Sequence, residues 1–103
     1  MKAVVIQKPG SFVIQDVPIP EPRDDQVQIE VRAVGICGTD VHIFHGEYVG
    51  DYPIIPGHEF AGVVTGVGQA VSRHKVGDRV AVEPNIVCNN CHPCLHNRQN
   101  FCA

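Results

Sequence analysis

Apolar and polar residues alternate with a period of two along most of this chain. The clearest case is residues 27–32, where Val and Ile alternate with Gln, Glu and Arg. This alternation is typical of a strand with one buried face and one face in water. A Pro9-Gly10 turn separates two further stretches with strand-like composition. Strands are expected over residues 2–7, 12–16, 27–32, 59–68 and 79–82.

Helical periodicity is scarce. Three prolines and three carboxylates mark residues 18–25 as a loop, and three glycines within 59–68 favour a bent strand or a bulge. Short helical turns are expected only over 39–44 and 93–99. Several short strands with Pro and Gly turns indicate a mainly β fold, a barrel or a sandwich.

Composition narrows the class of protein. The chain has 103 residues, a length that fits one small domain, with a formal net charge of -3 and only 8 Lys and Arg. Such a charge balance does not favour a nucleic-acid or anionic-membrane partner. The short apolar start has neither the h-region nor the cleavage site of a secretory signal, and no stretch is long enough to span a membrane. We therefore expect a cytoplasmic protein. In that reducing compartment, 5 cysteines favour metal binding over disulfide bonds.

Four of the cysteines lie close together with the spacing C-x2-C-x2-C-x7-C. Four thiolates can surround one tetrahedral ion and leave no position for water, which makes a structural site. The residues between them are too polar to fold on a core of their own, so metal must order the lobe, about residues 85–103. Two disulfides or free thiols are the plain alternatives. An iron–sulfur cluster is a third, but its usual continuation x3-C-P is absent, and zinc is favoured. The four cysteines are Cys88, Cys91, Cys94 and Cys102.

The fifth cysteine suggests a second metal site. Cys37 lies where the best strand ends, and His58 and Glu59 begin the next β segment. A thiolate and an imidazole at two strand–loop junctions can meet at one zinc, with the carboxylate as a third ligand or a partner. From the residues alone, a buried structural cysteine and a hydrogen-bonded histidine remain open.

Read together, the segments resemble the zinc-containing medium-chain alcohol dehydrogenases. Residues 35–42 (GICGTDVH) look like the first ligand segment of that family and 56–64 (PGHEFAGVV) like the second. Residues 76–80 (VGDRV) look like the strand that follows, and the four-cysteine lobe comes next, in the family's order. The resemblance covers essentially the whole chain, 1–103. It implies a GroES-like, partly open β-barrel that carries a cysteine-rich structural zinc lobe.

The resemblance also implies roles for single residues. Two zincs per full subunit are expected, one catalytic and one structural, and Asp40 would fix the tautomer of a ligating histidine. Zinc would lower the pKa of a bound alcohol, whose proton would pass through a hydroxyl and an imidazole to water. The implied assignments are Cys37, His58 and Glu59 for the catalytic zinc, Thr39 and His42 for the proton path, and Cys88, Cys91, Cys94 and Cys102 for the structural zinc.

The same resemblance leans towards the sorbitol and threonine dehydrogenase branch. A secondary alcohol such as a polyol, a sugar alcohol or threonine would then give a hydride to NAD or NADP in a full-length, homo-oligomeric enzyme. The chain has Gly66 and Gly68, but the third glycine of a dinucleotide-binding fingerprint is absent. The Rossmann domain is therefore expected beyond residue 103, and the chain alone is expected not to oxidise alcohols. A stand-alone zinc-binding structural module is the alternative.

Overall fold

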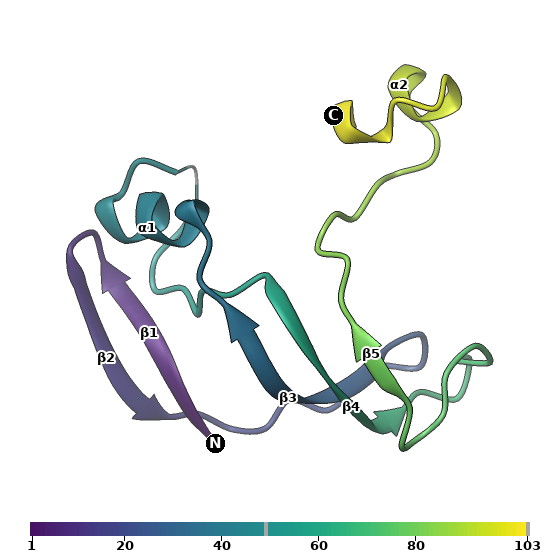
Figure 1. Cartoon of the computed structure of the whole chain (residues 1–103), viewed down its shortest axis with the longest axis horizontal. Helices are drawn as coiled ribbons and strands as arrows, with labels where there is room; N and C mark the ends of the chain where they lie inside the picture. The colour runs from purple at the N-terminus through teal and green to yellow at the C-terminus, as the bar shows by residue number, and fades with distance from the viewer. Residues whose placement is uncertain (49, 103) are drawn as a thin grey trace.

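The computed structural model describes residues 1–48 and 50–102, and within them the fold is mainly β (Figure 1). The predicted domain 1–103 thus includes two positions, 49 and 103, outside the described residues. All the expected strands are present, with ends within one to three residues of the predicted ones. The strands are β1 (Lys2–Lys8), β2 (Ser11–Asp16), β3 (Val27–Gly35), β4 (Glu59–Val67) and β5 (Arg79–Ala81).

The helical elements are short. They are α1 (Gly38–His45), α2 (His92–Leu95) and the 3-10 turn η1 (Gln99–Phe101). The helical turn expected over 39–44 is confirmed as α1. The turn expected over 93–99 is wrong as one unit, because Asn97 has a left-handed φ of 56° and separates α2 from η1.

β1 and β2 form an antiparallel hairpin around a left-handed Gly10. The hairpin is tied to the rest of the fold by backbone hydrogen bonds. The Gly10 N–H donates to the Phe44 carbonyl of α1 at 2.7 Å, and Ile6 forms a β-bridge with Ile54. The hairpin therefore supports the helix whose other end carries Cys37.

The second sheet has the order β3-β4-β5, and all its pairs are antiparallel. The register between β3 and β4 shifts twice, which confirms the irregular strand that the glycines predicted. Gly62 pairs with Val31 beside one of these shifts. A Cβ at position 62 would be 2.2 Å from the Glu30 carbonyl oxygen. Only glycine lets β3 and β4 approach this closely. The pairing ends with Gly35 opposite Glu59, and this end of the sheet carries the second candidate site.

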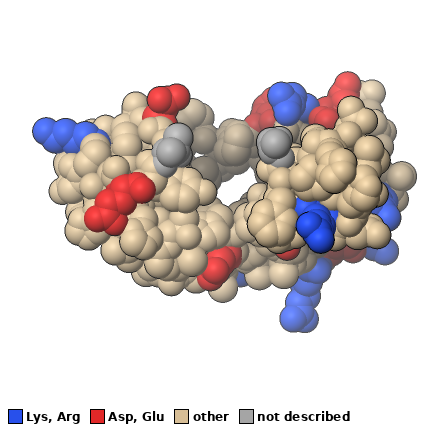
Figure 2. Space-filling view, turned by 90° about the horizontal axis from the view of Figure 1, so that it is seen from above, with Lys and Arg blue, Asp and Glu red and all other residues tan. Residues whose placement is uncertain are grey.

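The two sheets do not close into one barrel within the described residues. The radius of gyration is 15.8 Å, above the roughly 13 Å of a compact domain of this length. Among the described residues the buried apolar side chains are few, and large ones such as Ile36 and Ile86 are 86% and 97% exposed. Figure 2 shows an opening between the half with β1, β2 and α1 and the half with β5. The expected partly open fold is confirmed.

The cysteine lobe lies at the end of an extended segment that follows β5, away from both sheets (Figure 1). On the face that Figure 2 shows, Lys and Arg stand among Asp and Glu and form no basic stripe. No helix in residues 1–48 and 50–102 has the length and apolar character needed to cross a membrane.

Candidate metal centres

The four cysteine sulfurs of the lobe surround one point. Their Sγ atoms all lie within 4.8 Å of one another. Cys91 and Cys94 are 3.4 Å apart, Cys88 and Cys94 3.9 Å, and Cys91 and Cys102 4.0 Å. A disulfide needs about 2.05 Å, whereas four sulfurs at about 2.3 Å from one ion are roughly 3.8 Å apart. The arrangement fits a tetrahedral zinc.

Backbone N–H groups point at the sulfurs. Cys91 and Asn90 donate to Cys88 Sγ at 3.2 and 3.4 Å, and the Cys88 N–H donates to Cys102 Sγ at 3.3 Å. The bonds from Asn90 and Cys91 lower the pKa of the Cys88 thiol, because they stabilise its thiolate. The donors thus favour the charged form that binds metal, as expected for a thiolate site.

Cys94 is the opposite case. Its side chain is 7% exposed, and burial raises the pKa of its thiol to about 12. A buried thiolate needs a cation beside it, since desolvation disfavours a lone charge. A divalent ion at the centre of the cluster would supply that charge. The burial of Cys94 therefore also fits a zinc site.

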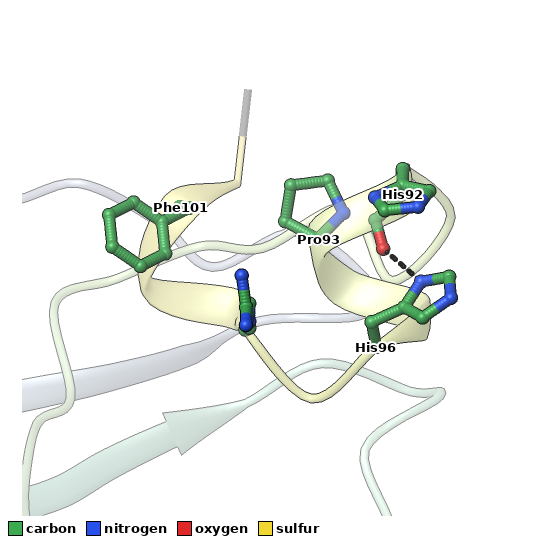
Figure 3. Close-up of a pocket in the computed structure, with 5 residues that line it drawn as sticks. His92, Pro93, His96 and Phe101 are labelled. Atoms are coloured by element: carbon green, nitrogen blue, oxygen red, sulfur yellow. Dashed lines mark hydrogen bonds between the residues drawn. The ribbon is translucent and has the colours of Figure 1, made fainter.

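The histidines of the lobe lie outside the cluster, as expected. His96 donates from Nδ1 to the His92 carbonyl at 2.8 Å, and the two rings stack with centroids 4.1 Å apart (Figure 3). With Pro93, Arg98 and Phe101 they line an open hollow of about 450 Å³. Both histidine side chains are exposed. They shape the surface of the lobe and lie outside its group of four thiols.

The second site forms where β3 ends and β4 begins. Because Gly35 pairs with Glu59 in an antiparallel register, Cys37 follows β3 at the same sheet end where His58 precedes β4. One ligand atom of each of Cys37, His58 and Glu59 lies within 4.8 Å of the others. Sequence-distant donors are thus brought together by strand pairing. A soft thiolate, an imidazole and a carboxylate form a donor set that zinc accepts.

Asp40 joins the two ligand segments. Its Oδ2 accepts a hydrogen bond from the Cys37 N–H at 2.9 Å, which caps the start of α1. Its Oδ1 faces His58 Nδ1 at 3.4 Å, is buried, and has no hydrogen-bond partner. This distance is long for a hydrogen bond, so Asp40 Oδ1 is a buried acceptor without a donor beside the His58 imidazole. A metal on the other ring nitrogen would fit this arrangement, because Nδ1 must then carry the proton that Asp40 can accept.

The two residues proposed for the proton path lie on α1. Thr39 Oγ1 is 3.7 Å from Cys37 Sγ, so its hydroxyl borders the site. His42 is one turn further along the same face of the helix and is exposed. Its Nδ1 lies 2.6 Å from Glu47 Oε2. Sequence reasoning missed Glu47. The signal was Gly46, whose left-handed φ of 78° ends α1 and turns the chain back on His42.

The site residues therefore divide into two groups. The structure brings together Cys37, His58 and Glu59, with Thr39 and Asp40 beside them. It also brings together the four cysteines of the lobe. Their catalytic and structural roles stay predictions.

Comparison with known proteins supplies the family. The model of the alcohol dehydrogenase GroES-like domain matches residues 23–103. Sorbitol dehydrogenase of Bacillus subtilis is 45% identical over 106 residues, covering 99% of this chain and 30% of that protein. L-threonine 3-dehydrogenase of the same organism is 45% identical over 109 residues, covering 100% of this chain and 31% of that protein.

Solved structures agree. A protein assigned as a zinc-binding dehydrogenase from Sinorhizobium meliloti 1021, solved with NADP bound, superimposes with a TM-score of 0.92 at 42% identity. The match covers 98% of this chain and 30% of that one. The chain thus spans about 30% of the length of the relatives it matches. It belongs to the GroES-like domain family of the zinc-containing alcohol dehydrogenases.

Proposed function

We propose that this chain provides the zinc-binding, substrate-facing part of an oxidoreductase that oxidises a secondary alcohol by hydride transfer to NAD or NADP. The observation that carries the proposal is the convergence of Cys37, His58 and Glu59 within 4.8 Å at one end of the β3–β4 sheet. A thiolate, an imidazole and a carboxylate leave a fourth position for a substrate oxygen, as catalytic zinc sites require.

The residues around that position have distinct tasks. Zinc held there would act as a Lewis acid that favours the deprotonated form of a bound alcohol. Asp40 anchors the Cys37 backbone, and its free Oδ1 would accept the Nδ1 proton of His58 once a metal occupied the other ring nitrogen. Thr39 can accept the proton of the alcohol and donate its own, because a hydroxyl does both. His42 then exchanges the proton with solvent, which its exposed ring permits.

The substrate class is proposed from the relatives. The two curated relatives carry the names sorbitol dehydrogenase and L-threonine 3-dehydrogenase, so a polyol, a sugar alcohol or threonine suits this chain best. A structural relative was solved with NADP, which supports a nicotinamide cofactor. We also propose one GroES-like domain over 1–103, a structural zinc lobe over about 85–103 and no dinucleotide-binding domain within this chain. A homo-oligomeric, cytoplasmic enzyme completes the proposal.

The alternative is a stand-alone zinc-binding module. Such a module needs the four-cysteine lobe but has no use for a second donor set beside a threonine hydroxyl. Asp40 argues against it, since a buried carboxylate oxygen facing an imidazole is costly without a role.

Cobalt substitution tests the proposal. Co²⁺ would replace zinc in the purified chain, and its visible bands report thiolate ligation and coordination number. We expect one band set that Cys37→Ser removes and that sorbitol perturbs, and a second, from the lobe, that sorbitol leaves unchanged. Absence of a Cys37-dependent band set would refute the proposal. The chain with NAD and a panel of polyols should show no turnover.

A further inference from the structure

The pair His42–Glu47, at the C-terminal end of α1, is a side-chain contact that no proposed role yet explains. The Glu47 carboxylate meets His42 Nδ1 at 2.6 Å. The Glu47 N–H also donates to the His42 carbonyl at 2.9 Å, because Gly46 turns the chain back at the end of the helix. His42 therefore holds Glu47 through both the backbone and the side chain of Glu47.

The chemistry of this contact selects a tautomer. A carboxylate only accepts hydrogen bonds, so the nitrogen facing it must carry a proton. When the ring is neutral it has one N–H, which then lies on Nδ1 and leaves a lone pair on Nε2. The hydrogen bond from His42 lowers the pKa of the Glu47 carboxyl. An ordinary imidazole changes charge near about pH 6.5. The Glu47 carboxylate is therefore still a hydrogen-bond acceptor in that pH range.

We propose that Glu47 is a positioning residue that fixes His42 in the Nδ1–H tautomer, so that Nε2 is the atom that takes up and releases protons. This rests on the proposed function insofar as His42 is the outer end of the proton path. Free imidazole side chains prefer the Nε2–H form. In that form Nε2 already carries a proton and has no lone pair with which to accept one. Fixing the ring also removes rotamers that would turn it away from α1.

Other charged groups near the pair are few among the described residues. His45, on the last turn of α1, adds a small favourable field at Glu47. Its ring packs edge-on to Phe44, with centroids 5.4 Å apart. His45 serves as an internal reference within the same helix.

The test is a measurement of tautomers. Long-range ¹H–¹⁵N spectra of the zinc-loaded chain at about pH 8, where imidazole is neutral, distinguish protonated from unprotonated ring nitrogens. We expect His42 to be protonated at Nδ1 in the wild type and mainly at Nε2 in Glu47→Ala. In Glu47→Gln the amide oxygen still accepts the bond, so the Nδ1–H form should remain in the majority. His45 should not change in either variant.

Two results would overturn the inference: an Nε2–H tautomer of His42 in the wild type, or an unchanged tautomer in Glu47→Ala. Glu47 is largely exposed, and backbone hydrogen bonds end α1, so the variants should keep the helix. An Nε2–H tautomer of His42 in the wild-type spectrum would refute the inference even without the variants. Since no turnover is measured, failure here is separate from failure of the Cys37 cobalt bands, which tests the proposed function itself.

Discussion

The two metal centres are assembled by different means. In the lobe all four donors come from one segment, residues 88–102, and their spacing in sequence nearly determines their spacing in space. In the second site Cys37 and His58 come from different segments, and the β3–β4 register brings them together. We therefore expect the first centre to be organised by its ion and the second by the sheet.

Burial follows the same division. Within the described part of the lobe only Cys94 is buried, so few apolar contacts hold it together. The β3–β4 pair forms a ladder along the whole length of both strands, with two register shifts, and includes Val64, which is fully buried. We expect the donors on the sheet to be in place before the ion binds, and the lobe to need the ion in order to fold.

Removal of zinc should have the largest effect, and only on the lobe. After chelation the amide signals of residues 88–102 are expected to collapse to unfolded positions, while those of β3 and β4 stay dispersed. Two-dimensional ¹H–¹⁵N spectra measure this. Cys94→Ser in excess zinc should give the same pattern, and His92→Ala, at an exposed position, should not. Lobe signals that survive chelation would contradict an ion-organised lobe.

Gly62→Ala should damage the second site and spare the lobe. Its Cβ would meet the Glu30 carbonyl oxygen at 2.2 Å, so β3 must move away from β4. Overpacking of this kind costs roughly 1–3 kcal/mol of unfolding free energy. Denaturant unfolding and the cobalt bands of each site report the effect.

Gly66→Ala is the matched control on the same strand. Its Cβ would lie 3.4 Å from the nearest side-chain atoms of Gln28, which is ordinary contact. We expect little change in stability and both band sets intact. Equal damage from the two alanines would show that strand approach at position 62 is not what holds the site.

Asp40→Asn should weaken metal binding at the second site alone. The amide can still accept from the Cys37 N–H, but it loses the charge that faces His58. Loss of such a partner typically lowers metal affinity by roughly 10–100-fold. Competition with a chelator of known affinity measures the change. An affinity equal to the wild type would mean that Asp40 serves only as a helix cap.

Gly35→Ala should have the smallest effect. A Cβ there would lie 3.1 Å from Glu59 Oε2, the mobile end of a side chain that can shift by a few tenths of an ångström. We expect an altered cobalt spectrum with stability changed by less than about 1 kcal/mol. Gly38→Ala, whose Cβ would meet nothing within 4 Å, is the control. Identical spectra in the two variants would argue that Glu59 does not approach the metal.

The sequence predicted different parts of the two centres for the same reason. Cysteine spacing is a local signal, and it predicted the lobe geometry directly. Strand positions were also predicted well, because alternation is local. The convergence of Cys37 with His58 depends on the β3–β4 register, which shifts twice. The glycines of residues 59–68 predicted a bent or bulged strand, but not which residues would be paired across it. From the residues alone that site was one interpretation among others, and the family resemblance is what favoured it.

Contacts made by exposed side chains were harder still. Glu47 carries no motif, and its contact with His42 depends on the left-handed turn at Gly46. The break between α2 and η1 at Asn97 was missed. Asparagine can adopt a left-handed φ, but the pattern of polar and apolar residues does not show where it does so. Turn conformation is the common element in both cases.

Zinc counting by native mass spectrometry shows whether Cys37 and His58 hold a metal ion in addition to the one in the cysteine lobe. At saturating zinc the wild-type chain should bind two ions, and Cys37→Ser should bind one, with the lobe amides unchanged. Cys91→Ser should also bind one, now with the lobe disordered. If Cys37→Ser binds as many ions as the wild type, the donors at the end of the β3–β4 sheet do not hold a metal, and the account is contradicted.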